Sequence, residues 1–325
     1  MRIVQGVRDR GMSAVVTERR PLFYAAGPDP DADRPAHVRA GSGLAVVGER
    51  IVVVQDDANF LALINPRTGR VDHATLPRGD GGARQFDDLR GNKEAKLDLE
   101  ACVSFQEGDE QVFVAFGSGA TGRRERIVWV TGLDYAEPSI EYIDGSLFYA
   151  KLRALEGFAP EGLNLEGVVI SERGEIWFAN RGTAREGRIL NGLVGFDQKE
   201  MLGLLAAPVD ARIPSSVGAL QFDLGALEGV PLGITDLTRT PEGLLFVAAA
   251  EETANTVDDG PVAGSVLGVV TPDGDARWAP IVDEDGRLFP GKVEGVVAFD
   301  DRLYAVVDQD DPNAASMFCE VVLSR

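Results

Sequence analysis

The sequence has few side chains that bind transition metals or form disulfides. Its 325 residues include only two histidines, His37 and His73, and this count excludes a histidine-rich zinc site. The two cysteines, Cys102 and Cys319, lie in apolar runs without CxxC spacing, so we expect them to pack in the core. Any metal site must therefore be built mainly from oxygen ligands.

Positive charge is also scarce. The chain has 32 lysines and arginines against 52 aspartates and glutamates, which gives a formal net charge of −20. This charge argues against nucleic acid or an anionic membrane as a partner, because both require a basic surface. Solubility alone is the other explanation of the acidity. The partner that we expect is a small molecule or a carbohydrate, and the sequence leaves the oligomeric state open.

Long apolar runs are missing. No segment approaches the length of a membrane-spanning helix, and residues 1–16 carry scattered charges instead of an apolar core. No signal peptide is recognisable, so a cytoplasmic location is expected. Helical periodicity is weak, and the candidates for a helical turn are Leu152–Gly157 and Gln198–Ala206.

The sequence is rich in turn residues and short strands. Its 38 glycines and 17 prolines predict many turns. In the first clear module, strands are expected at Gly43–Val47, Ile51–Val54 and Phe60–Ile64, and four later segments repeat this scheme. Short strands at even spacing are typical of a sheet built as a meander. The predicted fold class is therefore all-β.

One motif recurs at the start of these modules. The run Lys292–Val297 (KVEGVV) is nearly repeated at Leu163–Val169 (LNLEGVV), and looser copies begin near residues 41, 98 and 234. Distant copies of one motif indicate a repeat architecture. When the copies are aligned on the apolar residues that follow, the repeated position always offers a side-chain oxygen: Ser42, Glu100, Glu166, Thr235 and Glu294.

The spacing of these positions predicts a five-bladed β-propeller that forms a single domain of residues 1–325. Modules begin near residues 42, 100, 166, 235 and 294, at intervals of 58 to 69 residues. Counting from Glu294 through the C-terminus and on from the N-terminus to Ser42 makes about one more interval, so the ring closes. The last module lacks an outer strand, which we expect from Ser13–Arg19. A six-bladed ring is the alternative if Gln198–Gly233 hides a degenerate blade.

The repeated position should lie at one mouth of the central channel, because it begins the innermost strand of each blade. The second strand of each blade runs antiparallel to the first, so the segments that follow the second strands return to the same mouth. These segments are strongly polar. They supply the predicted binding residues, which are Asp56, Asp57, Asn59, Asn180, Arg181, Glu251 and Asp308.

Carboxylates held this close repel each other. At separations of about 4 to 6 Å and an effective dielectric near 20, each pair costs on the order of 3 to 4 kcal/mol. A cation would offset this cost, and a flexible ring of oxygens suits Ca²⁺ better than Mg²⁺. The hypothesis is one axial Ca²⁺ with these ligands: Glu100, Glu166 and Glu294 directly, and Ser42 and Thr235 directly or through water. The alternative is that the glutamates pair with lysines such as Lys96 and Lys292 around an empty, wet channel.

The ring resembles the calcium site of the calcium-activated nucleotidases (apyrases), which are five-bladed propellers. The residues that carry this resemblance are Lys292–Gly295, Ser42–Leu44 and Val53–Asp57. After its two aspartates that family normally continues with Arg-Thr-Gly, whereas this chain has Ala58-Asn59. Asn164–Gly167 (NLEG) is also similar to a motif of bacterial phytase-esterase-like propellers. The resemblance implies calcium in the ring and a hydrolase-like activity.

An enzyme of this kind would act on a phosphate or an ester. Ca²⁺ would polarise the substrate oxygen, Asp56 or Asp57 would orient or deprotonate water, and Arg181 would stabilise negative charge. The predicted substrate contacts are Asn59, Asn180, Glu251 and Asp308. Each catalytic candidate has a structural alternative, since the two aspartates suit a turn and Arg181 suits a salt bridge to Glu166.

A non-catalytic function is the alternative to an enzyme. Calcium would then be structural and hold the blades together at the hub, while the polar mouth binds a carbohydrate or a partner protein. The propeller fold does not separate these functions, because it carries many unrelated ones. A lactonase-like activity is a third possibility, which is disfavoured by the lack of histidines near the expected mouth.

Overall fold

The chain folds almost entirely into β-strands. A computed structural model describes residues 2–135, 137–206, 214–241, 243–252, 260–271 and 273–324. The helices of this part of the chain are α1 (Ser146–Ala154), α2 (Gln198–Ala206) and the 3₁₀ turns η1 (Asp80–Gly82), η2 (Lys93–Ala95) and η3 (Gly122–Arg124). None of these helices is long and apolar enough to cross a membrane.

The strands pair in chain order as antiparallel meanders. The first meander consists of β4 (Gly41–Val47), β5 (Arg50–Gln55), β6 (Phe60–Ile64) and β7 (Val71–Thr75). The second consists of β8 (Leu99–Glu107), β9 (Glu110–Gly117), β10 (Arg126–Thr131) and β11 (Ser139–Asp144). The third consists of β12 (Leu165–Ile170), β13 (Glu175–Asn180), β14 (Leu190–Asp197) and β15 (Ser216–Asp223).

Two further meanders complete the described part of the ring. The fourth consists of β17 (Val230–Thr240), β18 (Gly243–Glu251), β19 (Val262–Val270) and β20 (Ala276–Val282), with the short β16 (Ala226–Leu227) beside β17. The fifth consists of β21 (Lys292–Phe299), β22 (Arg302–Asp308) and β23 (Met317–Ser324), with β3 (Ser13–Pro21) as its outermost strand.

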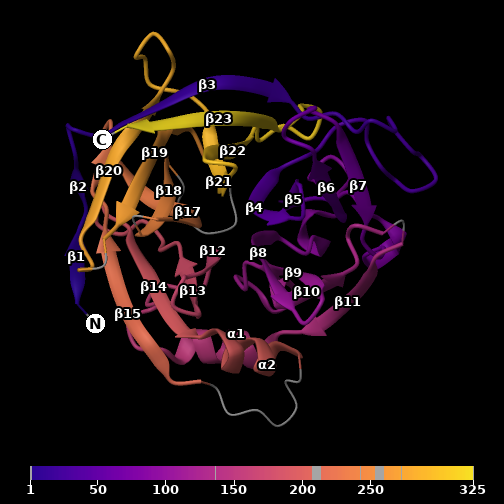
Figure 1. The fold of residues 1–325 in the computed structure, drawn as a ribbon, viewed down its shortest axis with the longest axis horizontal. Helices are drawn as coiled ribbons and strands as arrows, with labels where there is room; N and C mark the ends of the chain where they lie inside the picture. The colour runs from indigo at the N-terminus through magenta and orange to yellow at the C-terminus, as the bar shows by residue number, and fades with distance from the viewer. Residues whose placement is uncertain are drawn as a thin grey trace.

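The meanders are arranged as the blades of a propeller (Figure 1). Their first strands β4, β8, β12, β17 and β21 contact one another in turn around the centre, and the last of them contacts the first. The all-β propeller class predicted from the sequence is confirmed. The predicted closure is confirmed as well, because the N-terminal β3 pairs antiparallel with β23 over its whole length. In the stretch from 198 to 233, the described residues form α2, the outer strand β15 and the β16 hairpin.

The N-terminal segment runs along the outside of three blades. Strand β1 (Ile3–Gln5) pairs parallel with β15, and β2 (Val7–Arg8) pairs parallel with β20. The next strand, β3, pairs parallel with the end of β20 as well as with β23. We call residues 3–21 the N-terminal strap.

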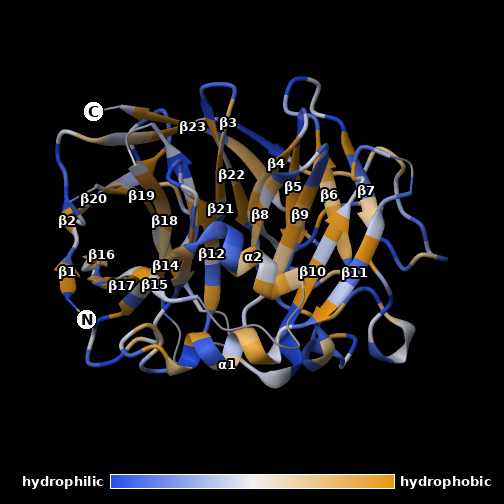
Figure 2. Cartoon of the chain, turned by 60° about the horizontal axis from the view of Figure 1, so that its bottom comes forward, coloured by the Kyte–Doolittle hydropathy of each residue, from blue (hydrophilic) through white to orange (hydrophobic). Residues whose placement is uncertain are grey.

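The core lies between neighbouring blades. The inner strands are mostly apolar, whereas the outer strands are mixed and the connecting loops are mostly hydrophilic (Figure 2). The inner strands are buried along most of their length, which explains why their sequences are almost continuously apolar. Both cysteines are buried free thiols, as predicted from their apolar surroundings.

Two helices cover the core between the second and third blades (Figure 1). The helix predicted at Gln198–Ala206 is confirmed by α2. In the second module, the sequence predicts an outer strand at Ile140–Ala150. This prediction is only partly right, since β11 ends at Asp144 and α1 begins at Ser146. The chain changes to a helix because one face of α1 buries Phe148, Tyr149 and Leu152 against the blades.

Candidate metal centre

Each innermost strand is irregular at the residue predicted as a ligand. In β8, β12, β17 and β21 the pairing with the next strand skips one residue, and in β4 the skip falls within Ser42–Gly43. The skipped residues of the other four strands are Glu100, Glu166, Thr235 and Glu294. Such a β-bulge leaves a residue out of the ladder and re-aims its side chain. The predicted equivalence of the five positions is therefore a shared backbone feature.

Close packing explains why glycine occurs at or next to the bulge. A Cβ at Gly295 would overlap the carbonyl oxygen of Ser42, and one at Gly43 would overlap the carbonyl oxygen of Glu100. Inner strands of neighbouring blades therefore approach backbone to backbone at the bulge. This close approach brings the side chains of neighbouring blades together at the mouth.

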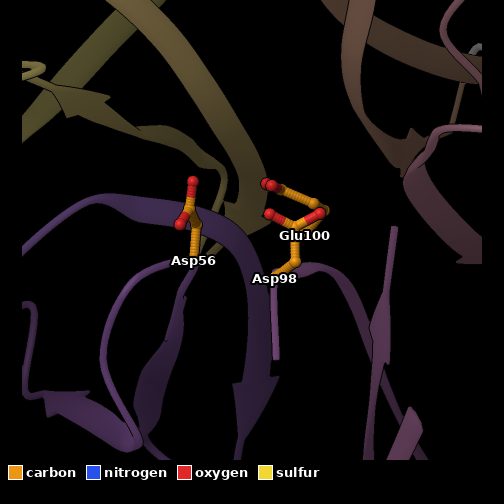
Figure 3. A group of neighbouring side chains, drawn as sticks. All are labelled: Asp56, Asp98 and Glu100. Carbon is orange, nitrogen blue, oxygen red and sulfur yellow. The ribbon is translucent and has the colours of Figure 1, made fainter. Parts of the chain in front are cut away.

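Three carboxylates gather on one side of the mouth. Ligand oxygens of Asp56, Asp98 and Glu100 lie within 4.8 Å of one another (Figure 3). The ammonium of Lys96 lies 2.7 Å from an oxygen of Asp56 and 2.7 Å from an oxygen of Asp98. Arg124 approaches Asp98 from the other side, with Nη1 at 3.0 Å. The two aspartates are thus paired with cations.

Glu100 differs from its two neighbours. Within the described ranges its carboxylate takes part in no ion pair or hydrogen bond, although it is partly buried. Burial, followed by the nearby charges of Asp56 and Glu166, raises the pKa of Glu100 well above its ordinary value. A cation beside Glu100 would remove this penalty and keep the carboxylate ionised.

Glu166 and Glu294 lie on β12 and β21, and among the described residues neither belongs to a group of three carboxylates within 4.8 Å of one another. Asn164 Nδ2 donates a 2.5 Å hydrogen bond to Glu166 Oε1, and Arg181 Nη1 lies 3.8 Å from the same oxygen. Lys292 Nζ lies 2.8 Å from Glu294 Oε1. Burial raises the pKa of Glu166 to about 8, against the lowering effect of Arg181.

The two hydroxyl positions of the ring keep their oxygen lone pairs available. Thr235 Oγ1 donates to the Val293 carbonyl at 2.7 Å, and Ser42 Oγ donates to the Ala40 carbonyl at 3.5 Å. Both side chains are buried. Because each hydroxyl uses its proton on the backbone, its oxygen can accept from water or coordinate a cation.

Negative charge exceeds positive charge at the mouth. The carboxylates are Asp56, Asp98, Glu100, Glu166, Glu251, Glu294 and Asp308, and the cations paired with them are Lys96, Arg124, Arg181 and Lys292. Burial and neighbouring carboxylates raise the pKa of Asp308 well above its ordinary value, and burial raises that of Glu294. The donor set is that of a hard-cation site.

The sequence matches the model of one protein family. A model described as a family of unknown function (DUF6929) matches residues 37–323. The chain belongs to this family. The match runs from just before β4 into β23, so it includes the inner strands of all the blades and omits the whole N-terminal strap, β3 included. A comparison of the sequence with curated proteins finds no match.

Solved structures resemble the chain distantly. A GH43 β-1,3-galactosidase solved with galactodeoxynojirimycin is 8% identical, with a TM-score of 0.48 and 94% of each chain covered. A GH43_1 enzyme from Xanthomonas citri is 9% identical, with a TM-score of 0.47, and covers 95% of this chain and 90% of its own. Regucalcin from Agrobacterium tumefaciens, a calcium-binding protein, is 12% identical, with a TM-score of 0.39 and coverage of 99% and 96%. None of these likenesses bears on the chemistry of the mouth.

The two adjacent aspartates predicted as catalytic lie in different surroundings. Asp56 belongs to the carboxylate cluster, whereas Asp57 accepts a hydrogen bond from Arg39 Nε at 3.0 Å. Arg39 is buried and also bonds Asp87 at 3.0 Å. Burial raises the pKa of Asp57 to about 6, against the charge of Arg39. Both aspartates line a pocket of about 320 Å³ that Lys96 and Asp308 also line.

Arg181 is held between two carboxylates. Its Nη2 lies 2.6 Å from Glu251 Oε2, and its Nη1 faces Glu166. Arg181 therefore forms the salt bridge that was given above as the alternative to a catalytic role.

The predicted substrate contacts Asn59 and Asn180 are buried. The Asn59 amide donates to the Pro77 carbonyl. The Asn180 side chain accepts from the Asn164 N–H and donates to the Arg181 carbonyl. Catalytic and substrate-binding roles for these residues stay predictions.

Sequence reasoning missed Asp98 and Asp236. Asp98 stands two residues before Glu100, at the position where Asn164 and Lys292 precede the other two glutamates, so the repeated motif carried a signal for it. The buried Asp236 carboxylate accepts backbone hydrogen bonds from Val296 at 2.9 Å and Leu237 at 2.7 Å. It therefore ties two neighbouring inner strands together beneath the ring.

Proposed function

We propose that the protein binds one Ca²⁺ at the mouth of its central channel. The observation that carries the proposal is Glu100, whose carboxylate lies beside those of Asp56 and Asp98 and takes part in no hydrogen bond or ion pair among the described residues. The ligands are Glu100, Glu166 and Glu294 directly, and Ser42 and Thr235 directly or through water.

Calcium suits this ligand set better than other metals. Glutamate and hydroxyl oxygens without histidine or cysteine favour a hard cation. Five ligands from five separate strands make a ring that is adaptable, and Ca²⁺ accepts six to eight oxygens in flexible geometry whereas Mg²⁺ requires a near-ideal octahedron. The remaining positions on the ion would be open to water or substrate.

Calcium titration of the metal-free protein tests the proposal. We expect calorimetry to detect one site and the melting temperature to rise with Ca²⁺. Glu100→Gln should abolish both effects, because it removes the unpaired charge. Glu107→Gln is the matched control, since Glu107 lies at the exposed far end of the same strand and should leave binding unchanged. Absence of Ca²⁺ binding by the natural chain would contradict the proposal.

We further propose that the bound ion takes part in hydrolysis of a phosphate or ester. Two observations support this: Asp56 and Asp57 line one pocket, and Asp56 belongs to the carboxylate group that contains Glu100. A pKa of about 6 suits Asp57 to act as a general base near neutral pH. The ion would polarise the substrate oxygen while the base activates water.

A panel of nucleoside diphosphates, phosphomonoesters, phytate and lactones tests this activity. Hydrolysis should require Ca²⁺, and both Asp57→Asn and Glu166→Gln should lower kcat at least about 100-fold, as loss of a general base or a metal ligand does. Turnover that survives chelation and both substitutions would exclude the metal mechanism.

Carbohydrate binding without catalysis is the second candidate. The observation that favours it is the acidity of the pocket, which Asp87, Asp88, Asp308 and Asp310 line together with Asp56 and Asp57. Carboxylates accept hydrogen bonds from sugar hydroxyls, whereas they repel a phosphate that is not shielded by a cation. Saturable binding of neutral oligosaccharides without turnover of any ester would favour this function over hydrolysis.

A further inference from the structure

A second cavity lies between the third and fourth blades, at the end of the sheets opposite to the channel mouth. Its volume is about 280 Å³. Turns at both edges help to line it, namely the β12–β13 turn around Arg173 and the β17–β18 turn at Pro241. Its apolar wall consists of Trp177, Leu193, Leu220, Leu244 and Val270. An apolar concavity with a few polar groups is the usual form of a small-molecule site.

Trp177 provides a flat floor for this cavity. The side chain lies across from Gly195 of β14, which is itself paired with Gly218 of β15. A Cβ at Gly195 would lie 2.5 Å from the indole, and one at Gly218 would lie 2.8 Å from it, so the ring rests on bare backbone. Trp177 Nε1 donates to Glu175 Oε2 at 3.0 Å, which fixes the ring in its plane. Trp177 also lines the cavity.

Two arginines lie at the rim of the cavity. Arg173 and Arg239 are exposed, and the described part of the chain offers neither guanidinium an ion pair or a hydrogen bond. Glu172 lines the same rim, while the Glu175 carboxylate is engaged by Trp177 and by Ser171 Oγ at 3.2 Å. On a chain with a net charge of −20, two guanidiniums that no described residue pairs, both at one cavity, favour an anionic ligand.

We propose that this cavity binds a small molecule in which a flat apolar ring carries a carboxylate. The ring stacks on Trp177 and contacts Leu220 and Leu244, and the carboxylate pairs with Arg239. The volume lies at the lower end of the range for ligand pockets, which fits a compound of one or two rings. The site is separate from the proposed calcium ring and does not depend on it.

Titration with 2-naphthoate by calorimetry tests the proposal, with 2-naphthamide as the uncharged analogue. We expect saturable 1:1 binding of the naphthoate and about tenfold weaker binding of the amide, because the charge-assisted bond to Arg239 is lost. Arg239→Gln should weaken naphthoate binding about tenfold and leave amide binding unchanged. Since Arg239 is exposed, this variant should fold normally.

A tryptophan pair provides the matched control. Trp177→Leu should weaken both probes at least tenfold, whereas Trp129→Phe, on β10 and packed against Phe105, should change neither. Circular dichroism checks that both variants are folded. Lack of saturation by 2-naphthoate up to millimolar concentration would overturn the proposal. Equal binding by the natural chain and Arg239→Gln would overturn it as well.

Discussion

Glu166 is a buried carboxylate at the channel mouth whose raised pKa should make the stability of the fold depend on pH. Its raised pKa has a cause that the sequence could not reveal, because burial depends on how neighbouring blades close over it. The alignment of repeats did identify Glu166, Glu100 and Glu294 as equivalent residues. It could not identify the pairing of Lys96 with Asp56, since that contact joins segments that share no repeat pattern.

The stability of the metal-free protein should fall as pH rises. Folded Glu166 keeps its proton up to about pH 8, whereas the unfolded chain releases it near its ordinary pKa of about 4.3. The folded state thus binds more protons between these values, and the free energy of unfolding should drop by on the order of 4 kcal/mol from pH 4.5 to pH 8. Urea unfolding in chelator across this range measures the slope. Glu166→Gln should flatten it, and an unchanged slope in that variant would contradict the prediction.

Arg181 should be essential for stability whatever its catalytic role. Arg181→Met leaves Glu251 and Glu166 buried without their shared partner, so we expect a loss of about 3 kcal/mol in the free energy of unfolding. Arg185→Met is the control four residues further on. Its exposed pair with Glu161, at 3.6 Å, should be worth less than about 1 kcal/mol. Equal losses in the two variants, measured by urea unfolding, would contradict this account.

At the scale of elements, the bulged inner strand is the unit that builds the ring. Alternating and continuous apolar residues were enough to predict the strands. The recurrent Glu-Gly pair lies at the bulge, but the sequence alone does not reveal that a bulge forms there. A bulge is a pairing property, so it becomes visible only when both strands are in place. The strand predicted at Ile140–Ala150 was partly wrong for a similar reason. The packing of α1 against the blades depends on tertiary contacts that a local strand pattern does not show.

Gly295→Ala should disturb the ring through the backbone. The new Cβ would overlap the Ser42 carbonyl, so the strands must separate at a cost of about 1 to 3 kcal/mol, and Ca²⁺ affinity should fall with it. Gly203→Ala in α2 is the control, because its Cβ would meet no atom within 4 Å and should stabilise the helix by up to about 1 kcal/mol. Thermal melts with and without Ca²⁺ compare the two. A harmless Gly295→Ala would refute the close approach of the strands.

At the scale of the whole molecule, closure of the ring joins the two ends of the chain. Module counting predicted the outer strand of the last blade, and β3 fulfils that role. Strands β1 and β2 escaped prediction, because short parallel pairings with distant strands leave no local pattern in the sequence. The N-terminal strap therefore does more than close one blade, since it also crosses the edges of two others.

Stepwise removal of the N-terminal strap separates these two roles. A chain that begins at Ser13 loses β1 and β2, including the buried Val4, and should lose about 2 kcal/mol while still melting cooperatively. A chain that begins at Leu22 also loses β3, with Ala14 and Val16, and exposes the whole edge of β23. We expect it to lose cooperative unfolding and to aggregate, because an unpaired edge strand recruits other chains. Calorimetric melting and light scattering distinguish the two variants, and identical melting would show that β3 does not close the ring.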